Sequence, residues 1–142
     1  MRTAAAVLLL ALGCSQATSG EGRIRALTQR YAQLTLAMDG TAIAHMFADD
    51  GELDVPGGEP VRGPMAVQQY LETFRDFHVL SNVLTVEKVA VNGATATSSG
   101  QYHQRVRIPN GETIDVHGGY AIDWVRQTDT WRFKRMSTTP SR

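Results

Sequence analysis

Several features that would point to a function are scarce or missing in this sequence. Lys plus Arg number 14 and Asp plus Glu number 14, so the formal net charge is zero, and the basic face that nucleic-acid binding usually needs is not indicated. No apolar run reaches the roughly 18 residues that a membrane-spanning helix requires. A glycine-rich phosphate loop, a CxxC pair and the spacing of a Ser-His-Asp triad are also missing. These absences argue against nucleic-acid binding, membrane spanning and several common kinds of catalysis.

Cysteine occurs once, as Cys14, so no intrachain disulfide can form. It follows Arg2 and an apolar run at 4–12, an arrangement typical of secretory signal peptides, and "LALGC" resembles the lipobox at which bacterial lipoproteins are cut. We therefore predict a signal peptide at 1–13, then a lipidated Cys14 with a flexible tether at 14–22, and a bacterial extracytoplasmic lipoprotein that touches the membrane only through its lipid anchor. The alternative is an ordinary signal with a chance cysteine, giving a secreted or periplasmic soluble protein.

The rest of the chain changes its hydrophobic period once, near residue 77. Before that point the sequence predicts three helices: one at 24–38 from apolar steps of three and four, a short one at 41–47, and one that starts at Gly63-Pro64. After it, apolar and polar residues alternate through four strands, separated by hairpin signals such as Asn-Gly, at 79–91, 94–108, 112–126 and 130–138. A further short strand is expected at 52–55. The prediction is one α+β domain at 23–140, with three N-terminal helices packed on a curved antiparallel sheet.

The hairpin around Pro109-Asn110-Gly111 allows its register to be predicted. If these three residues form the loop, with Gly111 in the left-handed region, Ile108 faces Glu112. His103 then faces His117, and Arg105 faces Asp115, on one side of the sheet. The opposite side collects the residues that must lie under the helices: Tyr102, Gln104, Val106, Ile114, Val116, Tyr120, Ile122 and Trp124.

The segment "LTQRYAQLTLAMDGTAIAHMFADDGELDVPGGEPVRG", at 27–63, resembles the opening of ketosteroid isomerase and its SnoaL-like relatives in the nuclear transport factor 2-like superfamily. The tail "GQYHQRVRIPNGETIDVHGGYAIDWVRQTDTWRFKRMSTTP" resembles small uncharacterised SnoaL-like domains. The resemblance implies a cone-like α+β barrel, a pocket between the first helix and the concave sheet, and a homodimer formed through the outer sheet face. Because this fold hosts isomerases, cyclases, hydrolases and binding modules, it does not by itself give a function.

Site residues of the isomerases map onto this chain only in part. The resemblance implies an oxyanion-hole tyrosine on the first helix, here Tyr31, which is the best catalytic candidate. It also implies a base immediately before Pro56, where the chain has Val55, and an acid on a later strand, near Tyr120. Asp54 comes one residue early, and strand alternation turns it to the opposite face. The family's isomerase chemistry is therefore in doubt.

The acidic run Asp49, Asp50, Glu52 and Asp54 has three possible interpretations. We favour a structural one, in which the first two end a short helix and the other two lie on the solvated face of an edge strand. A site for a hard cation is possible, but the spacing matches no calcium loop. A catalytic Asp54 in a shifted register is the third interpretation.

The other candidate functional side chains in the sequence are aromatic residues and histidines. We predict no cofactor and no metal, and we expect the facing pair His103 and His117 to serve solvation or a dimer surface rather than zinc. Apolar side chains with a few polar groups favour a small, mostly apolar ligand. Catalysis is left open, and the alternatives are a small isomerase, cyclase or hydrolase that uses Tyr31 as oxyanion donor, or an interaction module that works through the outer sheet face. The predicted pocket residues are Tyr31, Phe47, Val55, Tyr70, Tyr102, Gln104, Tyr120 and Trp124.

Overall fold

The computed structural model describes residues 19–142; Cys14, the predicted signal peptide and most of the predicted tether lie outside this part of the chain. Three helices come first and the long strands follow, as the change of period predicts. The elements are α1 (Gly20–Leu36), α2 (Gly40–Ala44), β1 (Phe47–Leu53), β2 (Val61–Arg62), α3 (Pro64–Glu72), β3 (His78–Asn92), β4 (Thr95–Arg107), β5 (Thr113–Gln127) and β6 (Thr130–Pro140). No helix within these residues has the length and apolarity needed to cross a membrane.

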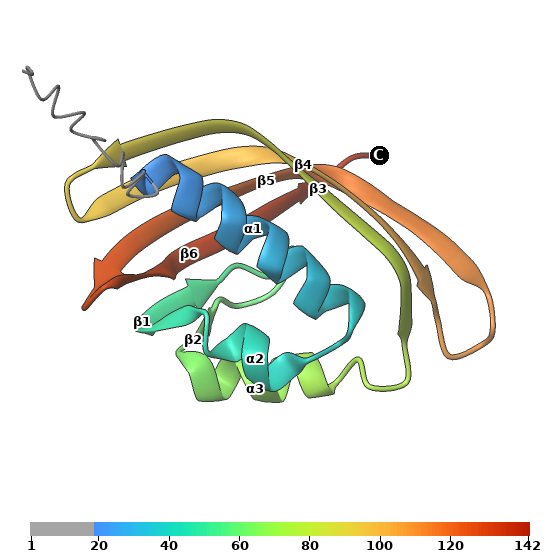
Figure 1. Cartoon of the computed structure of the whole chain (residues 1–142). Coiled ribbons are helices and arrows are strands. Elements are labelled where there is room, and N and C mark those ends of the chain that lie inside the picture. The colour runs from blue at the N-terminus through green and yellow to red at the C-terminus, as the bar shows by residue number, and fades with distance from the viewer. Residues whose placement is uncertain (1–18) are drawn as a thin grey trace, which may run out of the picture.

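The six strands form one open sheet in the order β2-β1-β6-β5-β4-β3. Figure 1 shows α1 lying across the concave side of the long strands, with α2, α3, β1 and β2 gathered at one end. The α+β class is thus confirmed. The sheet is mixed rather than antiparallel, because β1 runs parallel to β6, and it does not close into a barrel.

Helix α1 begins at Gly20, earlier than the helix start predicted at Ile24. The cause is a local cap: the Ser19 hydroxyl accepts a hydrogen bond from the Gly22 backbone N–H at 3.0 Å, which satisfies one of the open donors of the first turn. The most buried positions of α1 are Ile24, Thr28 and Ala32. Tyr31 lies beside this stripe and is half-buried.

The predicted end of the second helix is wrong. Asp39, rather than Thr41, caps α2 through a 3.0 Å bond from the Ala42 N–H, and Asp49 and Asp50 lie inside β1 instead of ending a helix. Gly51 lets the strand come close to β6, since a Cβ there would lie 2.5 Å from the Phe133 carbonyl oxygen. Pairing with β6 therefore overrides the local turn signal.

The predicted hairpin register is confirmed. His103 faces His117 and Arg105 faces Asp115, the Ile108 N–H donates to the Glu112 carbonyl at 2.9 Å, and Gly111 has a φ of 90°. Burial follows the predicted alternation over most of the hairpin, with buried side chains such as Val106 on one face and exposed ones such as His103 on the other. Ile114 is the exception: it was predicted to lie under the helices, but near the loop end of the hairpin it is 39% exposed.

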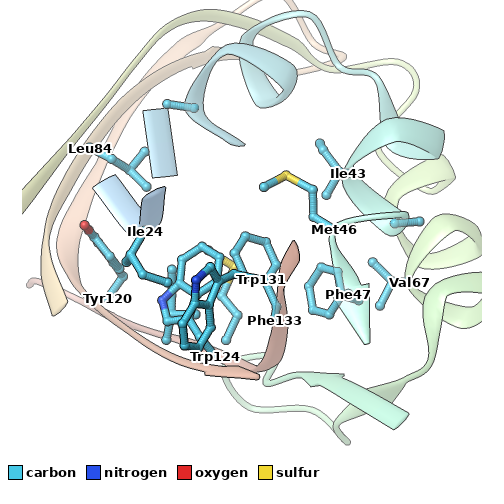
Figure 2. Close-up of a cluster of buried hydrophobic side chains, with 14 of the residues drawn as sticks. Ile24, Ile43, Met46, Phe47, Val67, Leu84, Tyr120, Trp124, Trp131 and Phe133 are labelled. Carbon is cyan, nitrogen blue, oxygen red and sulfur yellow. The ribbon is translucent and has the colours of Figure 1, made fainter. Parts of the chain in front are cut away.

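The core lies between α1 and the concave face, and its centre is Phe133 on β6. Its ring makes edge-on contacts with Trp124 at 4.7 Å and Phe47 at 5.1 Å between centroids. Figure 2 shows Trp124, Trp131 and Phe133 grouped near Ile24. The buried Trp124 indole donates to the Ser98 hydroxyl at 2.8 Å, so its polar atom is satisfied.

Candidate ligand-binding site

The eight predicted pocket residues separate into two groups by burial. Phe47, Tyr120 and Trp124 are closed off from solvent, with exposed fractions of 2%, 4% and 1%, and they belong to the core of the protein. The other five keep part of their surface accessible: Tyr31, Val55, Tyr70, Tyr102 and Gln104.

Tyr31 connects these two groups. Its ring meets the edge of Phe133 at 5.5 Å between centroids, so it lies against the same ring that Phe47 and Trp124 contact. Burial raises the pKa of the Tyr31 phenol, and Thr35 lowers it to a smaller extent. The hydroxyl is therefore a neutral hydrogen-bond donor at physiological pH.

Tyr102 and Gln104 reach the same region from the sheet. They are two residues apart on β4, so both point to the concave face. Gln104 pairs with Asn82 on β3, and the Asn82 amide donates to the Ala32 carbonyl on α1 at 3.1 Å. Ala32 is the chain neighbour of Tyr31, so this bond places that turn of α1 against the strand pair that carries Gln104, and Tyr31 and Tyr102 both pack against the core. Tyr31, Tyr102 and Gln104 are called the Tyr31 group below.

Tyr70 is not part of that group. It lies on α3, its ring contacts Phe74 at 5.3 Å, and Phe74 in turn contacts Phe77 at 5.3 Å. Burial raises the pKa of the phenol in both Tyr70 and Tyr102, and in Tyr102 an interaction with Thr138 opposes the rise.

Tyr120 stands near the position where the isomerases carry an acid, but its hydroxyl is already engaged. It donates to the Thr85 carbonyl at 2.9 Å. Burial raises the pKa of Tyr120 to about 12, the Glu87 carboxylate adds to the rise, and Arg25 counteracts it. In Figure 2 its oxygen points away from the aromatic group of the core. Tyr120 is thus a structural link between β5 and β3.

No carboxylate stands at the position of the isomerase base. Val55 is half-buried there, while Asp54 is turned to Arg135, whose Nε lies 2.8 Å from Asp54 Oδ2. Asp54 Oδ1 is buried without a hydrogen-bond partner within residues 19–142. Asp54 is therefore held in an ion pair with Arg135, whose Nη2 also lies 2.7 Å from Asp54 Oδ2.

Two more acidic side chains of β1 also have basic partners, whereas Asp49 is exposed and takes part in none of the ion pairs within residues 19–142. Asp50 pairs with Lys134 and Glu52 pairs with Arg62, and the hydrogen bond from Lys134 lowers the pKa of Asp50. In the described part of the chain, no three His, Cys, Asp or Glu side chains gather in a way that could hold a metal ion. The acidic run thus contributes long-range ion pairs.

Two open surface grooves lie at a different place from the predicted pocket. One, of about 590 Å³, extends between the Glu21–Arg25 pair of α1 and the β3–β5 strands. The other, of about 370 Å³, extends from Asp50 and Lys134 across β4 and β5. They share Thr97 and Asp123, which face each other across β4 and β5 and are exposed. Of the eight predicted residues, only Trp124 borders either groove.

Sequence reasoning did not include Phe133 among the site residues, although its ring joins Tyr31 to the core. Its alternation with Trp131 is typical of an inward-facing strand residue, but nothing local indicates which ring it contacts.

The side chains that hold α1 to β3 were also not predicted from the sequence. Gln29 donates to the Leu84 carbonyl at 3.2 Å and Arg25 to the Val86 carbonyl at 3.1 Å. These bonds join residues far apart in the sequence, so no local pattern could have revealed them.

The architecture described above, with N-terminal helices over the concave side of a strongly curved sheet, is that of the nuclear transport factor 2-like superfamily. The family model for the SnoaL-like domain matches residues 16–137, and the chain belongs to this family. No curated protein matches the sequence.

Solved structures agree with this assignment of the fold. A protein of unknown function from Mycobacterium tuberculosis is 24% identical, with a TM-score of 0.75 over 84% of this chain and 75% of that one. A ketosteroid isomerase-like protein from Erwinia carotovora is 16% identical, with a TM-score of 0.76 over 83% and 93%. An NTF2-like protein with a cystatin-like fold from Novosphingobium aromaticivorans is 24% identical, with a TM-score of 0.71 over 83% and 79%. At these identities the likeness extends to the fold alone.

Proposed function

We propose that this SnoaL-like domain binds a small, mostly apolar molecule between α1 and the sheet. The observation that carries the proposal is the partial accessibility of Tyr31, Tyr102 and Gln104, of which the two tyrosines pack against the otherwise closed aromatic core. These side chains offer neutral donors and acceptors on an apolar background, the usual composition of a ligand pocket. A neutral ligand with one carbonyl or hydroxyl group fits them best.

Binding without catalysis is favoured over an enzymatic role. Proton abstraction needs a base within reach of the substrate, but Val55 stands at the position of the family's base and Asp54 is paired with Arg135. A tyrosine whose pKa is raised can donate a hydrogen bond but accepts a proton poorly. The alternative is an enzyme in which Tyr31 donates to a developing oxyanion, with the base supplied elsewhere.

The site is tested first by native mass spectrometry of protein purified without denaturation. Under the proposal, the protein carries a small bound mass, and its identification gives the ligand class. Tyr31→Phe should weaken binding of a ligand with a polar group by roughly three- to tenfold, the worth of one hydrogen bond, without changing the fold. An unliganded protein that binds nothing in a panel of apolar carbonyl and hydroxyl compounds would rule the proposal out.

The same variant separates binding from catalysis. If the protein turns the ligand over, Tyr31→Phe lowers kcat by about a hundredfold or more, as the loss of one oxyanion donor does. Tyr70→Phe is the matched control, because the Tyr70 ring on α3 packs against Phe74, just after the helix, apart from the Tyr31 group. A variant that loses affinity while no turnover is seen in the parent supports the binding role.

We further propose that the protein is exported and anchored through lipidated Cys14, and that it forms a homodimer. The support is the leader pattern of the sequence and the family resemblance. Metabolic labelling with a fatty acid, followed by membrane fractionation, tests the anchor: Cys14→Ser should lose both label and membrane association. A labelled Cys14→Ser protein would exclude this attachment, and unlabelled, secreted wild-type protein would favour an ordinary signal peptide.

A second candidate is an interaction role for the outer sheet face. The observation that favours it is the position of the two grooves, which meet at the exposed pair Thr97 and Asp123. Asp123→Lys reverses the charge at this meeting point without touching the core. If the face is an interface between copies, this variant shifts the protein to the monomer in analytical ultracentrifugation, while Tyr31→Phe does not.

A further inference from the structure

Two of the four histidines stand directly opposite each other on the outer sheet face. His103 on β4 pairs with His117 on β5, and their ring centroids are 6.3 Å apart with an angle of 79° between the planes. Both side chains are exposed. The ladder holds the two backbones, and the Ser141 N–H donates to the His117 carbonyl at 2.8 Å on the other side of β5. The two imidazoles therefore project side by side from a rigid platform.

A carboxylate orients the first of these rings. Asp115 Oδ1 lies 3.3 Å from His103 Nε2, and the Nε of Arg105 lies 3.5 Å from the same oxygen. An ionised carboxylate only accepts hydrogen bonds, so in this contact His103 Nε2 is the donor, and Nδ1 is the nitrogen that a neutral imidazole offers to a metal ion. Histidine ligands of metal ions commonly have such a carboxylate on the nitrogen that does not bind the metal.

The spacing of the rings fits a shared metal ion. With a metal–nitrogen distance of about 2.0–2.1 Å, two imidazoles on one tetrahedral ion have ring centroids roughly 5–6 Å apart. The observed 6.3 Å requires only a small rotation of two exposed side chains. On the neighbouring strand β3, the residue opposite His103 is Val83, so no basic side chain at that position repels a metal ion. Arg105 is directed to Asp115.

We propose that His103 and His117 form an exchangeable zinc-binding site on the outer sheet face, with one imidazole nitrogen from each and water completing the coordination. Within residues 19–142 no cluster of three metal ligands exists, so the site has two protein ligands and binds zinc reversibly rather than as a structural ion. The sequence alone favoured solvation or a dimer surface for this pair. The structure changes that preference because it adds the Asp115 contact to the confirmed register.

The test is calorimetric titration of zinc chloride into the full chain carrying Cys14→Ser, made without a histidine tag. The substitution removes a thiol that would bind zinc more tightly than an imidazole. We expect saturable binding of one ion per chain near neutral pH and its loss in acid, where the imidazoles bind protons instead. His103→Ala and His117→Ala should each weaken binding by at least about tenfold, and Asp115→Asn by a smaller factor.

The other two histidines provide matched controls. His45 and His78 are exposed and lie outside the facing pair, so His45→Ala and His78→Ala should bind zinc as the parent does. In NMR spectra of the imidazole groups, zinc should shift the signals of His103 and His117 alone. Absence of saturable binding at millimolar zinc, or binding that survives the double substitution of His103 and His117, would overturn the proposal.

Discussion

The two faces of the sheet differ sharply in burial and charge, although the same strands form both. On the concave face, Trp124, Phe133 and Ile122 are almost fully buried under α1. On the outer face, their chain neighbours Asp123 and Lys134 are exposed and charged. The stability of the domain therefore lies on one side, while the chemistry that is open to partners and ions lies on the other.

The largest expected effect comes from the concave face. Phe133→Ala removes the ring that contacts Trp124, Phe47 and Tyr31, and it should lower the free energy of unfolding by about 3–5 kcal/mol. Thr97→Ala on the outer face should change it by less than about 0.5 kcal/mol. Urea denaturation of the two variants measures both values. Similar losses in the two would contradict the assignment of the core to the concave face.

A smaller effect is expected at Tyr120, whose hydroxyl links β5 to β3. Tyr120→Phe loses the hydrogen bond to the Thr85 carbonyl, which should cost about 1 kcal/mol at neutral pH. The folded pKa of about 12 exceeds the ordinary value near 10, so the folded state holds this proton more tightly. The part of the wild-type stability that depends on the protonated phenol is complete below about pH 10, and it is lost as the pH rises towards and through about 12.

Denaturation curves at neutral and alkaline pH measure this linkage. The variant should show a shallower fall in stability between about pH 10 and 12 than the wild type does, since it lacks the titrating phenol. Tyr70→Phe is the control variant. Within residues 19–142 the Tyr70 hydroxyl has no hydrogen bond comparable to the one that Tyr120 makes with the Thr85 carbonyl. Parallel curves for wild type and Tyr120→Phe would show that Tyr120 does not titrate in this range.

The smallest effect is expected at the exposed pair of Asp50 and Lys134. Asp50→Asn removes an ion pair between two exposed side chains, and such pairs contribute little to stability and are screened by salt. Since Lys134 lowers the pKa of Asp50, its contribution is present above the ordinary carboxyl pKa and is lost as the pH falls below it. Thermal unfolding of wild type and Asp50→Asn should show a slightly lower Tm for the variant in low salt and no difference in high salt. A large decrease that persists in high salt would mean that the pair is buried.

The parts of the fold that were predicted well depend on local patterns. The Pro109-Asn110-Gly111 loop fixed the register of β4 and β5, because a three-residue loop with a left-handed glycine permits one set of partners. The order of helices and strands followed from the change of hydrophobic period near Phe77. Both signals involve residues close together in the chain.

The parts that failed depend on partners far away in the chain. Asp49 and Asp50 have the composition of a turn, but β1 pairs with β6, and the contact between Asp50 and Lys134 spans 84 residues. The mixed character of the sheet has the same origin. For the candidate site, the sequence named Tyr31 and Tyr102 together with Phe47 and Trp124, but it could not separate accessible from closed side chains, because burial depends on how α1 lies on the sheet.

The sequence by itself determined which side chains share a face, since strand alternation and loop geometry act over a few residues. It also determined that His103 would face His117. Only the tertiary structure decided which side chains of the concave face are closed off from solvent, which acids find arginine or lysine partners, and that Asp115 contacts the His103 ring. Each of these depends on contacts between distant segments, whose geometry is set when the whole sheet assembles and not by any local pattern.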